Sequence, residues 1–349
     1  MKTQTAIQKH SSRSSSSIRV AVLGAGGLGK AAARIIGLKR SLRLTAICDS
    51  KGLVFDPQGL DCAAVAEGTN DVVASLRARK AVSDTTVLRD TDDPIGGVME
   101  VAEGIDAVLV ALPNLSNEFI PGVIERFAGA AKGLVFVDML KRTAAVQQLF
   151  GLDEAVKRAN SVALTGCGAT PGLLTAAAVL AAQSFIEVER VDIWWGVGIA
   201  NWEAYKATIR EDIAHVPGYS VEKAKAMTDA DVGAFLERTN GLLELHQMEH
   251  ADDVLLERVG VVRSQDQVEV GGVMDTRHAK KHVSTTMTLT GITYEGKRAS
   301  HRFILGDETT MAANVIGPAL GYLKRGVWLR DHKIFGVFGS TEFLPMVVQ

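Results

Sequence analysis

Hydrophobic and polar positions form alternating blocks along the first half of the chain. Short apolar runs, such as 18–23 (IRVAVL) and 107–112 (AVLVAL), are separated by longer mixed runs with helical spacing. Apolar runs of this length are typical of strands that are buried on both faces of a parallel sheet. The expected strands are 18–23, 43–48, 107–112, 134–138 and 162–165, and the expected helices are 28–38, 61–67, 71–80, 118–131, 143–158 and 173–182. This alternation predicts an α/β fold with a doubly wound parallel sheet.

The pattern changes after about residue 186. A polar, helix-like region covers about 202–240, and β-like runs follow it. The expected strands of this half are 188–199, 242–250, 256–262, 268–273, 282–293 and 298–305. They predict a mainly antiparallel sheet with a few helices as a second domain. A last helix is expected over about 308–324.

Composition narrows the classes of partner. The 349 residues carry 38 basic and 40 acidic side chains, a net charge of −2, which argues against nucleic acid or an anionic membrane. The cysteines Cys48, Cys62 and Cys167 form neither a disulfide framework nor a Cys-x-x-Cys pair, so we expect a cytoplasmic protein without a metal site. No apolar run is long enough to span a bilayer. The polar, Ser-rich residues 1–17 are expected to form a disordered tail rather than a signal peptide.

A glycine-rich loop follows the first expected strand and opens the first expected helix. It reads G-x-G-x-x-G, and Asp49 lies 20 residues after its last glycine, at the end of the next strand. Together these features form the dinucleotide fingerprint, in which backbone N–H groups and the helix dipole hold the pyrophosphate. Asp49 would accept hydrogen bonds from the adenosine ribose, which favours NAD, but Ser50 and Lys51 could meet the 2′-phosphate of NADP. The expected cofactor contacts in the loop are Gly24, Gly26, Gly27, Leu28 and Gly29.

Two further loops are expected at the carboxyl edge of the sheet, where ligands bind in such folds. Leu112, Pro113 and Asn114 end the strand 107–112 and are expected to flank the cofactor. Lys141 follows the strand 134–138 and is a candidate catalytic residue, with a solvated surface lysine as the alternative.

The stretch 165–172, TGCGATPG, joins an expected strand to an expected helix. Thr170 suits an N-cap and Pro171 a first helical turn. A helix start of this kind would present free N–H groups to the nicotinamide or to a substrate carboxylate, although a plain cap is the alternative. Cys167 is either a nucleophile with a lowered pKa or a small buried thiol. The expected cofactor contacts here are Gly168, Ala169, Thr170 and Pro171.

These motifs carry a family resemblance over about residues 18–185. GAGGLG, CDSKG, VALPN and GCGATPG resemble the saccharopine dehydrogenase-like reductases, and the segment 49–61 is similar to the homoserine dehydrogenases. The resemblance implies a Rossmann domain, an inserted α+β substrate and dimerisation domain, and a C-terminal helix that returns to the first domain. It also implies a homodimer, and hydride transfer to a C=N or C=O bond next to an amino acid or keto acid. The expected segments are the tail 1–17, the dinucleotide-binding domain 18–170, the substrate domain 171–307 and the C-terminal region 308–349.

The second half offers candidates on the segment 201–215. Tyr205, Lys206 and His215 could donate the proton that accompanies hydride transfer, and Arg210 could clamp a carboxylate. Trp202 closes a tryptophan-rich stretch, 194–202, that could floor a substrate pocket. The alternatives are an exposed amphipathic helix and tryptophans that serve core or dimer packing.

Histidines and acidic residues recur on the later expected strands. Glu244, His246, Met248 and His250 alternate along 242–250, so they would share one face of a strand. With Asp252 and Asp253 these residues could form a metal site, but two histidines at this spacing on a strand are too far apart to share one metal. We therefore favour a sheet face near solvent or a dimer contact. The basic segment 278–282 could attract an acidic substrate, or it could be a plain basic loop.

The motifs and the family resemblance together predict an NAD(P)-dependent oxidoreductase that transfers a hydride to or from an amino-acid-derived imine or carbonyl. Two alternatives stay open at this point. One is a homoserine or semialdehyde dehydrogenase, the latter with Cys167 as nucleophile. The other is a sensor or scaffold that binds NAD(H) without turnover, since a fold does not fix a function.

Overall fold

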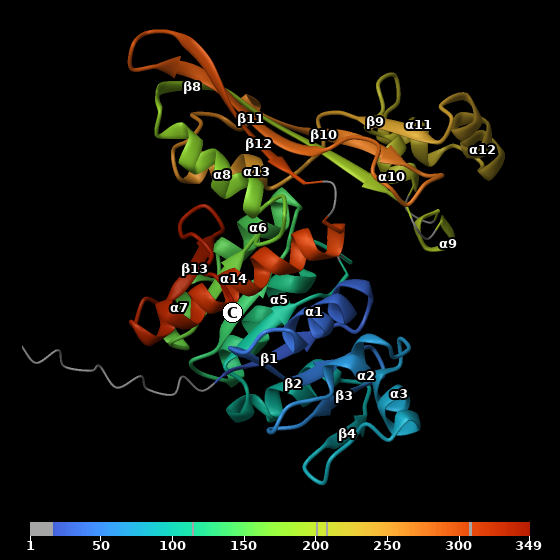
Figure 1. Ribbon diagram of the computed structural model, residues 1–349, viewed down its shortest axis with the longest axis vertical. Helices are drawn as coiled ribbons and strands as arrows, with labels where there is room; N and C mark the ends of the chain where they lie inside the picture. The colour runs from blue at the N-terminus through green and yellow to red at the C-terminus, as the bar shows by residue number, and fades with distance from the viewer. Residues whose placement is uncertain (1–16, 114, 200–201, 207–208, 307–308) are drawn as a thin grey trace, which may run out of the picture.

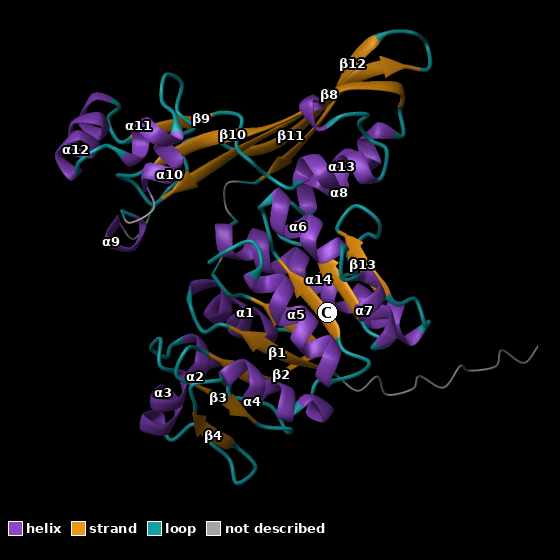
Figure 2. Ribbon diagram, turned by 180° about the vertical axis from the view of Figure 1, so that it is seen from behind, coloured by secondary structure: helices purple, strands orange, loops and turns teal. Residues whose placement is uncertain are grey.

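Two β-sheets organise the chain. The computed structural model describes residues 17–113, 115–199, 202–206, 209–306 and 309–349. In Figures 1 and 2 the two sheets lie one above the other in an elongated molecule, with α9 to α12 gathered at one end of the upper sheet. The expected tail 1–17 falls, except for residue 17, outside the described residues.

The first sheet has eight strands in the order β13-β7-β6-β5-β1-β2-β3-β4. The six from β13 to β2 run parallel, whereas β3 and β4 are antiparallel additions at one edge. This confirms the predicted parallel sheet. The sequence did not predict β3, β4 and β13, each only four residues long. The bounds are β1 (Ile18–Leu23), β2 (Leu42–Cys48), β3 (Gly52–Phe55), β4 (Val87–Asp90), β5 (Ala107–Val110), β6 (Val135–Asp138), β7 (Val162–Thr165) and β13 (Gly336–Gly339).

Helices cover both faces of this sheet, as its apolar strands require. One core lies under α1, α2, α3 and α14 and contains Ile36, Val73 and Leu320. The other lies under α4 to α7 and contains Ile124 and Val146. The expected helix 143–158 is in fact two helices, which are separated at Gly151 and Leu152. The bounds are α1 (Gly27–Gly37), α2 (Cys62–Ala66), α3 (Val72–Arg79), α4 (Pro94–Glu100), α5 (Phe119–Ala130), α6 (Thr143–Phe150), α7 (Asp153–Arg158) and α14 (Met311–Asp331).

The second sheet has the order β12-β11-β8-β10-β9. Its pairs are antiparallel except β8 with β10, which are parallel. The expected strand 256–262 is wrong, because this segment belongs to helix α13 and the turn after it. The expected strand 242–250 ends at Leu245. The bounds are β8 (Phe185–Gly198), β9 (Leu242–Leu245), β10 (Val268–Asp275), β11 (Thr285–Thr293), β12 (Arg298–Leu305), α8 (Leu173–Ala182), α9 (Trp202–Tyr205), α10 (Ile209–Ile213), α11 (Val221–Lys225), α12 (Asp229–Arg238) and α13 (Asp252–Arg258).

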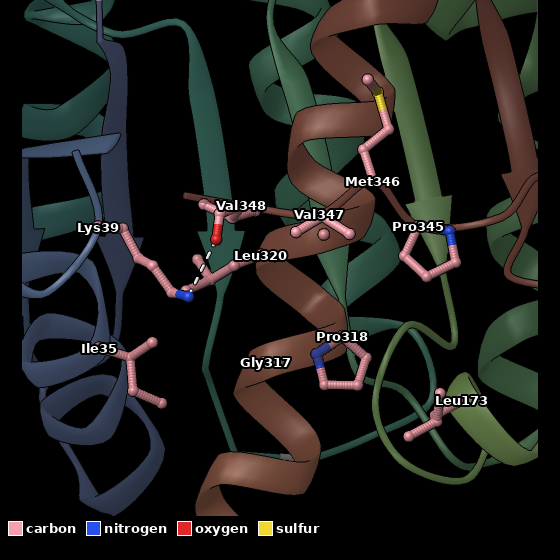
Figure 3. A pocket seen from close by; sticks show the side chains of 11 residues that line it. Ile35, Lys39, Leu173, Gly317, Pro318, Leu320, Pro345, Met346, Val347 and Val348 are labelled. Atoms are coloured by element: carbon pink, nitrogen blue, oxygen red, sulfur yellow. Dashed lines mark hydrogen bonds between the residues drawn. The ribbon is translucent and has the colours of Figure 1, made fainter. Parts of the chain in front are cut away.

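The last helix, α14, returns the chain to the first sheet. It packs on β6, β7 and α1, and Gly326 lies so close to the sheet that a Cβ there would meet Val135 at 2.4 Å. The C-terminal residues then pass over α1 and α14, where Lys39 Nζ donates a 3.0 Å hydrogen bond to the carbonyl of Val348. Figure 3 shows the pocket of about 250 Å³ at this junction, with Ile35 on α1 and Lys39 just after α1 opposite Pro318 and Leu320 on α14. Among the described helices, none is both long and apolar enough to cross a membrane.

Candidate active site

The glycine-rich loop has the geometry that a dinucleotide requires. Gly24 has a φ of +105°, and a Cβ there would lie 2.4 Å from the carbonyl oxygen of Ala111. A Cβ on Gly29 would lie 1.8 Å from the carbonyl oxygen of Gly24, so loop and helix are in backbone contact. Gly26 and Gly27, in contrast, are exposed at the start of α1 and have no heavy atom within 4 Å of a built Cβ. The loop thus leaves open the space where backbone N–H groups hold a pyrophosphate.

The acidic residue of the fingerprint is already hydrogen-bonded to backbone. Asp49 Oδ1 accepts from the N–H groups of Lys51 and Gly52, at 2.8 and 3.2 Å, and Oδ2 accepts from Val72 N at 2.6 Å. A carboxylate offers about four lone-pair positions, so a ribose hydroxyl can still be accepted. Lys51 Nζ pairs with Asp71 at 3.1 Å while Ser50 is exposed. Ser50 and Lys51, the two candidates for contact with a 2′-phosphate, therefore both lie next to Asp49.

A cavity of about 790 Å³ opens between the two sheets. Residues that follow β5, β6 and β7 form its floor: Pro113, Lys141, Arg142, Ala169 and Thr170. Its other walls come from β8, β10, β12, α10 and the start of α14, with Trp195, Met274, Leu305, Asp212 and Asn314. The cavity is therefore at the carboxyl edge of the parallel sheet, where ligands bind in doubly wound folds.

The cavity walls combine an apolar surface with opposite charges. Trp195, Val197, Met248 and Met274 supply apolar surface from the second sheet and the segment after β9. Glu211 and Asp212 supply carboxylates; Lys141, Arg142, Lys280 and Lys281 supply cations. This lining suits a ligand with an aliphatic body and charged or polar ends.

Tyr205 and Asp212 form a hydrogen-bonded pair that faces Lys141. Tyr205 Oη donates to Asp212 Oδ2 at 2.6 Å. Burial raises the pKa of Asp212, against the opposing effects of the Tyr205 hydrogen bond and the Lys141 charge. Burial and the charge of Asp212 raise the pKa of Tyr205 well above its ordinary value. Tyr205 therefore keeps its proton, and the pair places negative charge near the Lys141 ammonium.

A buried polar cluster lies next to the loop that carries Lys141. His250 lines the cavity, and its Nδ1 lies 2.6 Å from Asp252 Oδ2. Asp252 is completely buried and also accepts from Thr170 Oγ1, at 2.8 Å, and from Thr175 Oγ1. The backbone N–H of Ala251 donates to the carbonyl of Lys141 at 2.8 Å. The segment that carries His250 is therefore bonded directly to the loop that carries Lys141.

Comparison with known proteins identifies the family. The chain is 42% identical over 353 aligned positions to the (S)-8-amino-7-oxononanoate synthase BioU of Haloferax mediterranei, which covers 94% of this chain and 99% of that protein. The chain belongs to the BioU family. Residues 1–109 also match the model of the family Glutamate/Leucine/Phenylalanine/Valine dehydrogenase.

Solved structures of amino-acid dehydrogenases share the fold. The C. glutamicum DAP dehydrogenase in complex with DAP is 17% identical, with a TM-score of 0.51 and 94% of each chain covered. The engineered D-amino acid dehydrogenase bound to NADP+ is 15% identical, with a TM-score of 0.52 and 94% of each chain covered. The predicted fold class, a Rossmann sheet with a second sheet domain, is confirmed. The finer resemblance to saccharopine and homoserine dehydrogenases stays a prediction within this BioU family chain.

The TGCGATPG loop differs in detail from the sequence prediction. Helix α8 begins at Leu173, and its N-cap is Gly172 with a φ of +130°, not Thr170. A Cβ on Gly172 would lie 1.9 Å from the carbonyl oxygen of Gly168, so the loop folds back on itself. Thr170 is free of the capping role and donates to Asp252 instead. Ala169 and Thr170 line the cavity.

Cys167 does not have the environment of a nucleophile. Its side chain is completely buried, and Sγ lies 3.6 Å from the carbonyl oxygen of Thr165. Burial and the nearby Asp138 raise its pKa well above the ordinary value. A reactive thiol needs access and a lowered pKa, so the structure opposes a Cys167-dependent semialdehyde dehydrogenase.

Several other sequence candidates lie away from the cavity lining. Arg210 donates to the carbonyl of Met227 at 2.9 Å and pairs with Asp229 at 2.6 Å, so it ties α10 to the region before α12. Trp202 packs in the apolar cluster under α10 to α12. The carbonyl of His215 accepts from the N–H of His246, the residue after β9, and Lys206 is exposed after α9. Of the tryptophan-rich stretch, Trp195 is the residue that lines the cavity. Asn114 lies outside the described residues.

The sequence interpretation missed the role of His250 and Asp252. It placed His250 on one strand face with His246, but the strand ends earlier and His250 turns inward. His246 stays half-buried, with Nε2 3.1 Å from Glu244 and Nδ1 3.4 Å from Glu269. In the described ranges no group of three or more His, Cys, Asp or Glu side chains is arranged to hold a metal ion.

Proposed function

We propose that this chain is an NAD(P)-dependent oxidoreductase whose substrate or product is an aliphatic amino-oxo acid of the 8-amino-7-oxononanoate class. The observation that carries the proposal is the cavity between the two sheets, which begins at the carboxyl edge beside the open glycine loop. Its volume of about 790 Å³ falls within the roughly 300–1,000 Å³ typical of small-molecule sites. The substrate class comes from the name of the BioU relative.

The residues present fit a nicotinamide dinucleotide. Gly24, Gly26 and Gly29 would hold the pyrophosphate, Asp49 the adenosine ribose, and Pro113 and Ala169 would flank the nicotinamide end. The bound cofactor would supply or accept a hydride at the substrate carbon. NAD and NADP both remain candidates, with NAD favoured by Asp49.

The charged walls suit both ends of an amino-oxo acid. Glu211 and Asp212 can hold an ammonium group, while Arg142, Lys280 and Lys281 can hold a carboxylate. The apolar surface of Trp195, Val197 and Met274 can pack against the methylene chain between them.

Lys141 supplies the amine of the cavity floor, three residues after the end of β6. Beside a carbonyl substrate, an amine can donate a proton or add to the carbonyl carbon, which releases water and leaves an imine. The charge of Lys141 acts on the Asp212 carboxyl, so the two groups lie close enough to interact across the cavity.

The first experiment is calorimetric titration of NADH and NADPH into the wild type and Asp49→Ala. Tight binding of NADH that is lost in Asp49→Ala supports the fingerprint, and tighter NADPH binding shifts the contact to Ser50 and Lys51. Turnover of 8-amino-7-oxononanoate, followed through the nicotinamide absorbance, then tests the reaction. Borohydride trapping with intact mass measurement distinguishes an imine at Lys141 from a proton donor. Absence of binding by either cofactor would reject the oxidoreductase.

The expected homodimer and the expected cytoplasmic location accompany this proposal. The family resemblance implies the homodimer, and the scattered, unpaired cysteines of the sequence favour the reducing cytoplasm. Light scattering of the purified protein measures the oligomeric state directly.

A further inference from the structure

We infer that His250 is the acid–base residue of this site and that Asp252 positions it. This inference rests on the proposed oxidoreductase function and deepens it, because it names the group that moves the proton. It follows from the contacts of His250 with the cavity, with Asp252 and with the loop of Lys141.

Asp252 holds one nitrogen of the imidazole ring, Nδ1. Its two oxygens accept from His250 Nδ1, Thr170 Oγ1 and Thr175 Oγ1, and the carboxylate is completely removed from solvent. A buried carboxylate on Nδ1 selects the tautomer with the proton on that nitrogen. The neutral ring then presents Nε2 as an acceptor, and the protonated ring presents it as a donor.

Nε2 is the ring atom left for a ligand. Among the described residues no hydrogen bond to Nε2 is formed, and Nε2 is not one of the buried polar atoms without a partner. His250 itself is only 5% exposed, so the access it has is through the cavity that it lines. An imidazole held at one nitrogen and open at the other is the arrangement of a general acid or base.

The other candidates for proton transfer are less suited. The Tyr205 hydroxyl is committed to Asp212 at 2.6 Å, and Lys141 is attracted to the same carboxylate. His215 and Lys206 do not line the cavity. His250, in contrast, lines the cavity and has one ring nitrogen that no described side chain engages.

The step balances around the substrate heteroatom. In the direction of reduction, a bound dihydronicotinamide would supply a hydride to the substrate carbon, and the π pair of C=O or C=N would move to the heteroatom. The proton on His250 Nε2 passes to that heteroatom and leaves a neutral imidazole. In the direction of oxidation, neutral His250 takes the proton back. Asp252 keeps its hydrogen bond to Nδ1 throughout.

The pH dependence of this step reflects several neighbours. Asp252 and Asp253 approach from α13, and the charge of His250 acts on Asp253. The other titratable or charged groups around His250 are those of the cavity walls. The cations are Lys141, Arg142, Lys280 and Lys281, and the acidic groups are Tyr205, Glu211 and Asp212. Removal of the Asp252 charge should lower the pKa that controls the step, because the carboxylate stabilises the imidazolium.

The test compares His250→Ala, His250→Gln and Asp252→Asn with His246→Gln as the matched control. His246 is four residues earlier and half-buried, with both ring nitrogens on glutamates. We expect kcat to fall by about 100-fold or more in both His250 variants, with calorimetric NAD(P)H affinity unchanged, and to stay within about 3-fold in His246→Gln. Added imidazole should restore part of the rate to His250→Ala. Asp252→Asn should move one limb of the pH profile to lower pH. This is the alkaline limb in the direction of reduction, where His250 donates the proton, and the acidic limb in the direction of oxidation. Asp252→Glu should restore it in part.

A second measurement separates this proposal from the proposed function. In NMR spectra, the His250 ring resonances of the wild type should shift when 8-amino-7-oxononanoate is added, and the low-field Nδ1–H signal should disappear in Asp252→Asn. Wild-type protein that binds no nicotinamide would reject the oxidoreductase. His250 resonances that ignore the ligand, or His250 variants within about 3-fold of the wild-type rate, would reject the role of His250 alone.

Discussion

The backbone N–H of Ala251 donates a 2.8 Å hydrogen bond to the carbonyl oxygen of Lys141. The bond joins the segment between β9 and α13 to the loop after β6, across 110 positions of sequence. His250 and Lys141 both line the cavity, so this bond fixes the spacing of the two backbone segments that carry them. A backbone contact of this kind limits the relative motion of the two loops and so helps to keep reacting groups in position.

Replacing Lys141 should abolish most of the activity. Lys141→Ala removes a cavity amine opposite Asp212, and we expect kcat to fall by at least about 100-fold with little change in melting temperature, because the residue is exposed. Steady-state kinetics and thermal denaturation measure both. Lys132→Ala, an exposed lysine after α5, is the control. Equal losses in the two variants would show that the effect is not specific to the site.

Two glycines of the same loop should respond in opposite ways. An alanine Cβ at Gly26 meets no atom within 4 Å, so Gly26→Ala should fold normally and weaken NAD(P)H binding by about 10-fold or more, since the Cβ enters the space of the pyrophosphate. Gly29→Ala places its Cβ 1.8 Å from a backbone oxygen and should lower the melting temperature instead. Calorimetry and thermal melts read the two effects. A melting temperature that falls equally in both would contradict the loop geometry.

Asp138 should make stability depend on pH. Burial raises its pKa to about 6 from 3.8, against hydrogen bonds from Leu140 N, Gly166 N and Thr165 Oγ1. The folded state therefore holds a proton that the unfolded state releases between these values, so this contribution to stability is lost as pH rises from about 4 to 6. The stability of the wild type relative to Asp138→Asn should fall by about 3 kcal/mol over that range. Urea denaturation at several pH values measures this, and a pH-independent difference would contradict it.

Cys167 should be dispensable for chemistry. Cys167→Ala removes a buried sulfur with a raised pKa, so we expect activity within about 3-fold of wild type and a stability loss of about 1 kcal/mol. Iodoacetamide should label Cys62, which is partly exposed, before Cys167. A large loss of activity without loss of stability, or substrate protection of Cys167 from labelling, would return the thioester mechanism to consideration.

The sequence predicted the parallel half of the fold because its signals are local. The strands β1, β2 and β7 are mostly apolar, and the first and last glycines of the G-x-G-x-x-G motif make backbone contacts that a Cβ would block. The four-residue strands β3, β4 and β13 carry too few positions to show a period. These strands form because they pair with neighbouring strands of the sheet, and the order of strands in the sheet differs from their order in the chain.

The cavity was harder to predict because its residues meet only after folding. His250 and Asp252 follow a strand that ends at Leu245, and their inward direction depends on Thr170 and Thr175 from another part of the chain. Arg210 has the character of a carboxylate clamp, yet Asp229 on a neighbouring helix engages it. Residue type therefore identified the chemistry that was present, while tertiary contacts decided which side chains were available for it.

Helix α14 connects a distant packing contact to the cavity. Its first turns supply Asn314 and Val315 to the lining, and Gly326, 11 residues later, lies against Val135 and Leu164 of the first sheet. At about 1.5 Å per residue, these points are separated by about 16 Å along a stiff rod. A bulky residue at Gly326 would push one end of the helix off the sheet and move the other end within the cavity. In a mutational scan such a substitution would therefore register as a defect in substrate affinity, although its side chain never comes near the ligand.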